Sequence, residues 1–182
     1  QREMILISVF FSILIILPGP PARAGDVPDE RPAPCDCSAY IVDTDPKGLN
    51  VRSGPGMGYP VVDTLPTNNP VEVTIRQSKG PWMMIDRAYI FAETGLTDNI
   101  DKTLNGFVYG PLLGARTQSN GREHVSLYAE PRTDSAVVAE LPDETEVTLS
   151  GCSGEWLKVR YGAIEGWLDP ASRCGNPVTT CP

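Results

Sequence analysis

The sequence predicts an all-β protein made of two small barrels in tandem, and three observations support this fold class. The chain repeats itself, because residues 49–74 shifted by 76 positions lie on residues 125–150 with matching apolar positions. Short segments alternate apolar and polar residues, which is the period of a half-buried strand. The 18 prolines are spread along the chain, and prolines at this density suit strand edges and turns and prevent long helices.

The repeat keeps order, spacing and chemistry. Its first part aligns Pro55 with Pro131 and Leu65-Pro66 with Leu141-Pro142. After a gap of two residues, Gly80-Pro81-Trp82 meets Gly154-Glu155-Trp156, and later Gly106-Phe107-Val108 meets Gly166-Trp167-Leu168. Each unit therefore holds about five short strands separated by turn signals, which is typical of a small barrel.

These boundaries divide the chain into five parts. We expect a signal peptide over 1–24, a Pro-rich linker over 25–39, a first barrel over 40–115, a second linker over 116–123, and a second barrel with a cysteine-containing tail over 124–182. The first barrel also carries a longer hairpin insertion over 86–105. Such an insertion either packs on a barrel or forms a binding loop.

The N-terminal segment predicts export. Residues 4–17 are apolar except for Ser8 and Ser12, a proline-rich break follows, and Ala22-Arg23-Ala24 places small residues where a signal peptidase cleaves. The run is shorter than the roughly 20 residues that a membrane-spanning helix needs. We therefore expect cleavage after Ala24 and a mature protein in the periplasm or outside the cell.

Five cysteines follow the expected cleavage site, and export makes disulfides their default state. Cys152 and Cys174 flank the last hairpin of the second unit, which predicts a bond between them. Cys181 is expected to pair with Cys35 or Cys37. The alternative of a zinc site is disfavoured, because gaps of one and six residues within the two pairs do not suit a structural zinc site. We expect neither a metal nor a cofactor.

Charge and composition exclude several functions. The formal net charge of −8 disfavours binding to nucleic acid or to anionic lipid. The glycine-rich segment 54–58 is not a phosphate loop, because no Gly-Lys-Ser/Thr follows and Pro60 blocks the required helix. Catalysis by a Cys-His or Ser-His pair would have to use His124, which is the single histidine of the sequence. Because it lies immediately before the first strand of the second unit, we interpret it as a surface residue of the linker.

Paired carboxylates are the remaining catalytic candidates. Asp43 with Asp45, and Asp143 with Glu144, lie in polar turns where nothing is expected to raise a carboxyl pKa. We interpret both pairs as solvated and predict no enzymatic activity.

The segment Gly48-Leu49-Asn50-Val51-Arg52-Ser53-Gly54-Pro55-Gly56 resembles the opening strand and turn of bacterial SH3 domains. The later segments Gly80-Pro81-Trp82 and Gly106 to Leu113 agree with this resemblance, and so do Gly154 to Val159 and Gly166-Trp167-Leu168 in the second copy. The second copy departs from the pattern at Leu127 to Pro131. The resemblance implies two SH3-like barrels in an exported protein, and several members of this family bind cell-wall peptides.

Aromatic residues recur near the strand ends that line an SH3-type groove, where they either contact a ligand or close the barrel core. We predict a ligand site in the first barrel, made by Arg52, Tyr59, Trp82 and Tyr109. The guanidinium of Arg52 can reach a carboxylate, and the rings can cover the apolar part of a peptide. The second barrel is expected to act as a brace.

The sequence thus favours a non-catalytic binding module for a peptidoglycan peptide or another envelope component. The alternative is a protein-interaction module that binds or regulates an envelope enzyme or a receptor.

Overall fold

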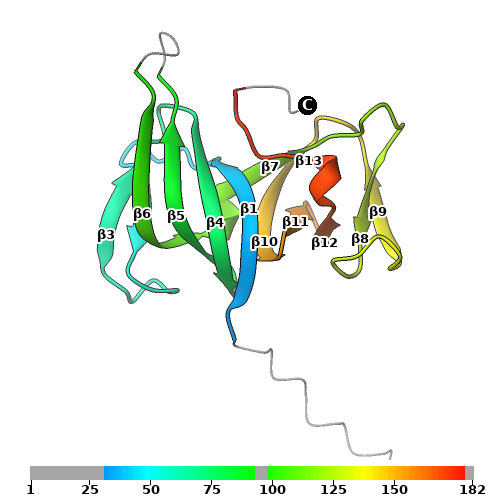
Figure 1. Ribbon diagram of the computed structural model, residues 1–182, viewed down its shortest axis with the longest axis horizontal. Helices are drawn as coiled ribbons and strands as arrows, with labels where there is room; N and C mark the ends of the chain where they lie inside the picture. Colours follow the sequence, from blue (N-terminus) through cyan, green and yellow to red (C-terminus); the bar gives the residue numbers. More distant parts are fainter. Residues whose placement is uncertain (1–30, 93–97, 179–182) are drawn as a thin grey trace, which may run out of the picture.

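The computed structural model describes residues 31–92 and 98–178, and its ordered elements are β-strands and two short 3₁₀ turns (Figure 1). No α-helix occurs in these residues. The strands of the first half are β1 (Ala33–Ile41), β2 (Leu49–Arg52), β3 (Val61–Leu65), β4 (Val71–Lys79), β5 (Trp82–Ile90), β6 (Ile100–Tyr109) and β7 (Leu113–Thr117). Those of the second half are β8 (Val125–Tyr128), β9 (Val137–Leu141), β10 (Glu146–Ser153), β11 (Trp156–Tyr161), β12 (Ile164–Leu168) and β13 (Arg173–Cys174). The 3₁₀ turns are η1 (Gly110–Leu112) and η2 (Pro170–Ser172).

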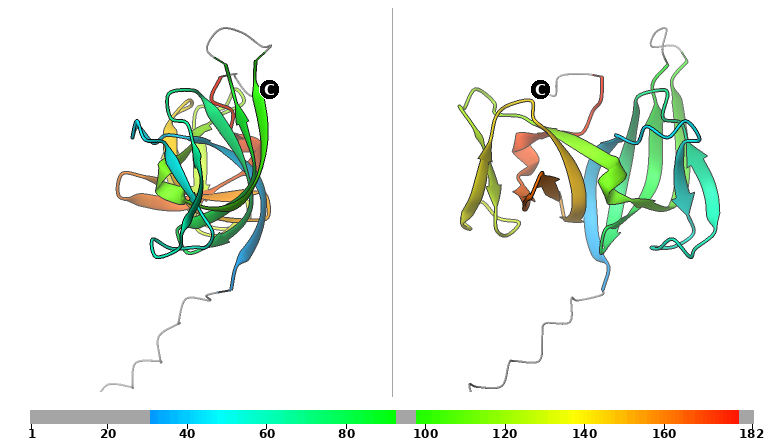
Figure 2. Two further views of the ribbon diagram at one scale, coloured as in Figure 1. Left: turned by 90° about the vertical axis from the view of Figure 1, so that its left-hand side faces the viewer. Right: turned by 180° about the vertical axis from the view of Figure 1, so that it is seen from behind.

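The two halves have the same topology. Hydrogen bonding runs in the order β3-β2-β6-β5-β4-β1-β7-β10-β11-β12-β8-β9, and β13 pairs with β7. Figure 1 shows β3 to β6 curled on one side of the molecule and β8 to β12 curled on the other, with β1 and β7 between them, and Figure 2 shows the same division from behind. The predicted all-β fold with two small barrels in tandem is confirmed.

Strand β7 belongs to both barrels. Along one edge, Leu113 and Gly114 pair with Ile41 and Tyr40 of β1, which closes the first barrel. Residues 114–116 also pair with β10, and 116–117 pair with β13, so the same strand opens the second barrel. Its apolar residues Leu113 and Ala115 are fully buried. The barrels are therefore joined by a shared wall.

The predicted linker over 25–39 is wrong for residues 33–39, which form most of β1 and pair with β4. Residues 25–30 lie outside the described part of the chain. The strand has a physical basis in the sequence, because Cys35, Cys37 and Ala39 occupy alternate positions and are buried. Shifted by 76 residues, 37–41 also lie on β7 at 113–117. The repeating unit thus begins with β1 in the first half and with β7 in the second, one strand before the matching segments 49–74 and 125–150.

The second predicted linker, 116–123, is also corrected. Arg116 and Thr117 are the last residues of β7, and the backbone N–H of Gln118 donates to Ser172 at 2.9 Å. The next turn is fixed as well, because the carboxylate of Asp143 accepts a hydrogen bond from the backbone N–H of Ser119 at 2.6 Å. This segment is therefore the end of a strand followed by a turn that hydrogen bonds fix between the barrels.

The predicted Cys152–Cys174 bond is wrong, because Cys152 is bonded to Cys35 with a Cα–Cα distance of 5.8 Å. Cys174 lies in β13 and is bonded elsewhere, and Cys37 keeps a free, buried thiol. The predicted pairing of Cys181 with Cys35 or Cys37 is therefore wrong too, while Cys181 itself lies outside the described residues.

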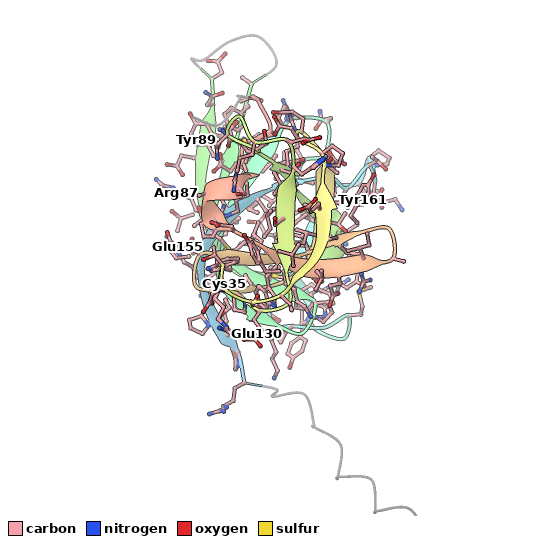
Figure 3. All side chains as sticks on the ribbon, turned by 90° about the vertical axis from the view of Figure 1, so that its right-hand side faces the viewer. Cys35, Arg87, Tyr89, Glu130, Glu155 and Tyr161 are labelled. Carbon is pink, nitrogen blue, oxygen red and sulfur yellow. A yellow bond between two sulfur atoms is a disulfide. The ribbon has the colours of Figure 1, made fainter. Side chains whose placement is uncertain are left out.

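The pairing follows from the position of β1. The start of β1 lies against the turn between β10 and β11, where Asp36 N–H donates to Gly154 at 2.7 Å and Gly154 N–H donates to Pro34 at 2.8 Å. Figure 3 looks onto the second barrel and shows Cys35 near Glu155 of this turn. The bond thus fastens the first strand of one barrel to the other barrel.

The insertion predicted at 86–105 consists, in its described residues, mainly of longer strands. β5 pairs with β6 from Trp82↔Tyr109 to Ile90↔Ile100, and β4 follows β5 as far as Val71↔Ile90. Figure 1 shows this hairpin projecting above the first barrel. The tip, 93–97, lies outside the described residues.

One apolar cluster fills the molecule. Buried side chains of both barrels belong to it, among them Leu49, Ile75, Leu127 and Leu149, and Leu113 of the shared strand contributes as well. Because the cores are continuous, burial of apolar surface stabilises the two barrels together.

Candidate functional site

A pocket of about 360 Å³ opens on the first barrel, where the loop after β1 approaches the ends of β2, β5 and β6. Three of the four predicted site residues, Arg52, Trp82 and Tyr109, line it. The other lining residues are Asp43, Asp45, Gly48, Leu49, Asn50, Met57 and Leu112.

Two aromatic rings form one wall of the pocket. Trp82 begins β5 and Tyr109 ends β6, and the two residues are partners in the β5–β6 register. Their ring centroids are 5.4 Å apart with an interplanar angle of 52°. Trp82 is half-buried and Tyr109 is 40% exposed, so both rings offer apolar surface next to a polar edge.

Arg52 is positioned by the alternation of β2. Leu49 and Val51 face the core, so Asn50 and Arg52 face outward. Nη1 of Arg52 donates to the carbonyl oxygens of Met57 at 3.2 Å and Tyr59 at 2.9 Å. The guanidinium therefore fixes the turn after β2, and Arg52 also lines the pocket.

Tyr59 is not among the lining residues and has a structural position instead. Its ring covers Gly54, where a Cβ atom would lie 2.4 Å from ring carbons. The glycine of the turn is thus required by the ring that packs on it. The sequence predicted this tyrosine as a ligand-binding residue, but in the structure its ring packs on the turn after β2.

The pocket is also lined by Asp43 and Asp45, which the sequence led us to interpret as solvated, and by Met57 and Leu112, which were not predicted as site residues. The aspartates follow β1 and lie in the loop that leads to Gly48. Their position could have been inferred only by recognising β1 as a strand, since the loop is oriented by the strand before it.

The second barrel lacks the same arrangement. At the position of Arg52 the repeat has Tyr128, whose ring makes an edge contact with Trp156 at a centroid distance of 5.8 Å. At the position of Tyr109 it has Asp169, whose side chain caps η2 by accepting from Ala171 N–H at 2.8 Å. The tryptophan is retained and its ring partner is Tyr128, but neither the arginine nor the tyrosine that aligns with Tyr109 is present.

The structure shows the surroundings of three groups that were considered for catalysis, Cys37, His124 and Asp143. Burial raises the pKa of the free thiol of Cys37 to about 11, so this cysteine is protonated at neutral pH. The carboxylate of exposed Glu123 lies 3.5 Å from His124. Hydrogen bonding from the backbone of Ser119 lowers the pKa of Asp143, which therefore does not act as a general acid at neutral pH.

Within residues 31–92 and 98–178, no three His, Cys, Asp or Glu side chains gather as metal ligands. In the same residues, no helix has the length and apolar character to cross a membrane.

The protein family described as "Bacterial SH3 domain" matches this chain at residues 47–110 and 123–173, which together make up more than half of its length. The chain belongs to this family, with two copies of the domain. It is also similar to the "Putative N-acetylmuramoyl-L-alanine amidase YrvJ" of Bacillus subtilis (strain 168), with 23% identity over 141 residues. The aligned region covers 72% of this chain and 26% of that protein, so the chain spans about a quarter of the length of this relative.

Proposed function

We propose that this protein is an exported, non-catalytic binding module that holds a peptide of the bacterial cell wall in the pocket of its first barrel. The observation that carries the proposal is the pair of rings, Trp82 and Tyr109, on the wall of a pocket that Arg52 also borders. Apolar surface with a few convergent polar groups is what small-ligand and peptide sites use.

Comparison of the two barrels favours a single site. The second barrel has neither the arginine nor the second ring at the matching positions, and its role is to brace the first through the shared strand β7. We therefore expect one peptide to bind per chain.

The cysteines favour export. Disulfides persist in oxidising compartments, and Cys35 and Cys152 are bonded, as is Cys174. The apolar segment at 4–17 has the character of a secretory signal, although it lies outside the described residues.

The absence of catalysis is part of the proposal. It is supported by the thiol of Cys37, which is buried and protonated, and by His124, which lies exposed on the surface beside the carboxylate of Glu123. The relative from Bacillus subtilis bears the name of an amidase of N-acetylmuramoyl-L-alanine, and this chain matches about a quarter of it. The similarity therefore favours a wall ligand without assigning this chain the amidase activity.

A cell-wall pull-down tests the proposal. We expect wild type to sediment with purified peptidoglycan and Trp82→Ala to lose roughly thirtyfold in affinity, because removal of an anchoring ring typically costs about 2 kcal/mol. Trp156→Ala is the matched control, since it removes the equivalent ring from the second barrel, and near-UV circular dichroism verifies folding.

Equal loss in both variants would place the site elsewhere. If wild type does not sediment, the cell-wall ligand is excluded, and binding to an envelope enzyme or receptor becomes the function to test.

A further inference from the structure

The pocket has an acidic end that the proposed function does not explain. Asp43 and Asp45 lie in the loop before β2, and the carbonyl of Asp45 accepts from Gly48 N–H at 2.9 Å and from the hydroxyl of Thr67 at 2.6 Å. These bonds hold the loop at the entrance of the strand. The two carboxylates are thus fixed at one end of the pocket.

One oxygen of each carboxylate is used locally. Oδ1 of Asp43 accepts from Asp45 N–H at 3.1 Å, and Oδ1 of Asp45 accepts from Lys47 N–H at 2.9 Å. A carboxylate has acceptor sites on both oxygens, so each keeps capacity for a donor from a ligand.

The two aspartates also differ from Asp63 and Asp101 of the same barrel. Asp63 is paired with Lys102 at 2.7 Å, and Asp101 is paired with Arg87. Within the described part of the chain, no lysine or arginine forms an ion pair with Asp43 or Asp45. The acidic end therefore carries two carboxylates that have no ion-pair partner among the described side chains.

The opposite end of the pocket is basic, because Arg52 ends β2, four residues beyond Gly48 in the loop that precedes this strand. At about 3.3 Å per residue, the two ends are roughly 13 Å apart along β2. Arg52 pairs with Phe107 of the antiparallel strand β6, so Tyr109 at the end of β6 lies beside the middle of β2, with Trp82 as its partner. Leu112 also lines the pocket. The pocket is negative at one end, apolar in the middle and positive at the other.

Resting on the proposed function, we propose that the pocket recognises a peptide through a primary ammonium group, which binds at Asp43 and Asp45. The aliphatic stem of that amine lies against Trp82 and Tyr109, and a carboxylate of the same peptide faces Arg52. The ligand class is a short extended peptide that contains a diamino acid with a free side-chain amine. Charge complementarity fixes the direction of the peptide along β2.

Paired peptides test the ammonium contact. The first probe is N-acetyl-L-Ala-γ-D-Glu-L-Lys-D-Ala. The second is the same peptide with the lysine side chain acetylated, which removes the positive charge and two of the three N–H donors and adds an acetyl group. Calorimetric titration of wild type is expected to show at least about tenfold weaker binding of the second peptide, because a charge-assisted hydrogen bond is worth about 1.5–3 kcal/mol.

Two matched variants distinguish the effect of the pocket carboxylates on binding from the effect of the net charge of the protein. In Asp43→Asn/Asp45→Asn the two peptides should bind about equally. Glu130→Gln/Asp134→Asn changes the net charge by the same amount on the second barrel, where both side chains are exposed, and it should keep the tenfold preference.

Two outcomes overturn the inference while the proposed function stands. Either wild type sediments with cell wall and binds both peptides equally, or the preference for the free amine survives in Asp43→Asn/Asp45→Asn. If wild type neither sediments nor binds either peptide, the proposed function itself fails.

Discussion

Cys35 and Cys152 are separated by 117 residues of sequence and are joined by a disulfide that ties β1 of the first barrel to β10 of the second. The carbonyl of Cys152 also accepts from the hydroxyl of buried Ser78 at 3.0 Å, so the bond lies in a contact between the barrels. A crosslink over such a long loop constrains the unfolded chain strongly.

Removal of this crosslink should destabilise the whole molecule. We expect Cys35→Ala/Cys152→Ala to lower the free energy of unfolding by about 3–5 kcal/mol, measured by guanidinium denaturation. The comparison variant is Cys37→Ala, which removes a buried thiol without breaking a crosslink and should cost less than the double variant. Equal losses would show that packing, and not the crosslink, accounts for the effect.

Cys37 should resist labelling in the native state. Burial is the main cause that raises its pKa from 9.0 to about 11, and the thiolate is the reactive form. Alkylation of folded protein by iodoacetamide should therefore be slow at pH 8 and keep rising with pH up to about 11, whereas the unfolded chain should level off near pH 9. Cys37→Ala supplies the background, and rapid native labelling at pH 8 would contradict the prediction.

The same shift predicts a loss of stability in alkali. The folded state holds the proton of Cys37 more tightly than the unfolded state, so its contribution is complete below pH 9 and is lost as the pH rises from 9 to 11. Over this window the stability of wild type should fall by about 2–3 kcal/mol more than that of Cys37→Ala. The stability of both proteins is measured by chemical denaturation at each pH. If the two lose the same free energy of unfolding between pH 9 and 11, the predicted role of Cys37 is wrong.

Gly110 should tolerate no side chain. A Cβ atom there would lie 2.9 Å from the carbonyl oxygen of Pro81 and 3.0 Å from that of Leu149, which belong to different barrels. Backbone atoms on both sides cannot move aside easily, so Gly110→Ala should cost about 1–3 kcal/mol. Gly58→Ala is the matched control, because a Cβ atom at Gly58 meets nothing within 4 Å. Similar thermal midpoints for the two variants would contradict the close approach.

Arg52→Ala should loosen one turn without unfolding the barrel. Its Nη1 donates to the carbonyls of Met57 and Tyr59, so backbone amides of residues 53–60 should exchange with deuterium faster in the variant. Arg132→Ala is the control, since this arginine makes exposed contacts in the second barrel. Unchanged exchange over 53–60 would show that the two hydrogen bonds do not hold the turn.

The strands inside each unit could be predicted because their alternation is strong. Leu49 and Val51 in β2 and Val147 and Leu149 in β10 bury every second residue, which a sequence displays directly. The aromatic wall was also accessible, because Trp82 and Tyr109 stand at strand ends that become neighbours in an SH3-like barrel. Those predictions depended on local pattern and on the repeat.

The sequence did not reveal what depends on one strand's position in the whole fold. β1 begins within a proline-rich stretch, and its buried residues include small ones such as Cys37 and Ala39, so its alternation is weak in hydrophobicity. Without β1, neither the Cys35–Cys152 bond nor the orientation of Asp43 could be inferred. Long-range pairing is set by tertiary packing, which local pattern does not contain.

The position of β7 in both barrels governs how the molecule can be divided. A fragment that ends before Leu113 leaves β1 without its partner at Tyr40 and Ile41, and a fragment that begins after Thr117 leaves β10 and β13 without theirs. No single cut in the gene therefore yields two complete domains. Each half could be produced alone only if residues 113–117 were duplicated, so that both fragments carried their own copy of the same five amino acids.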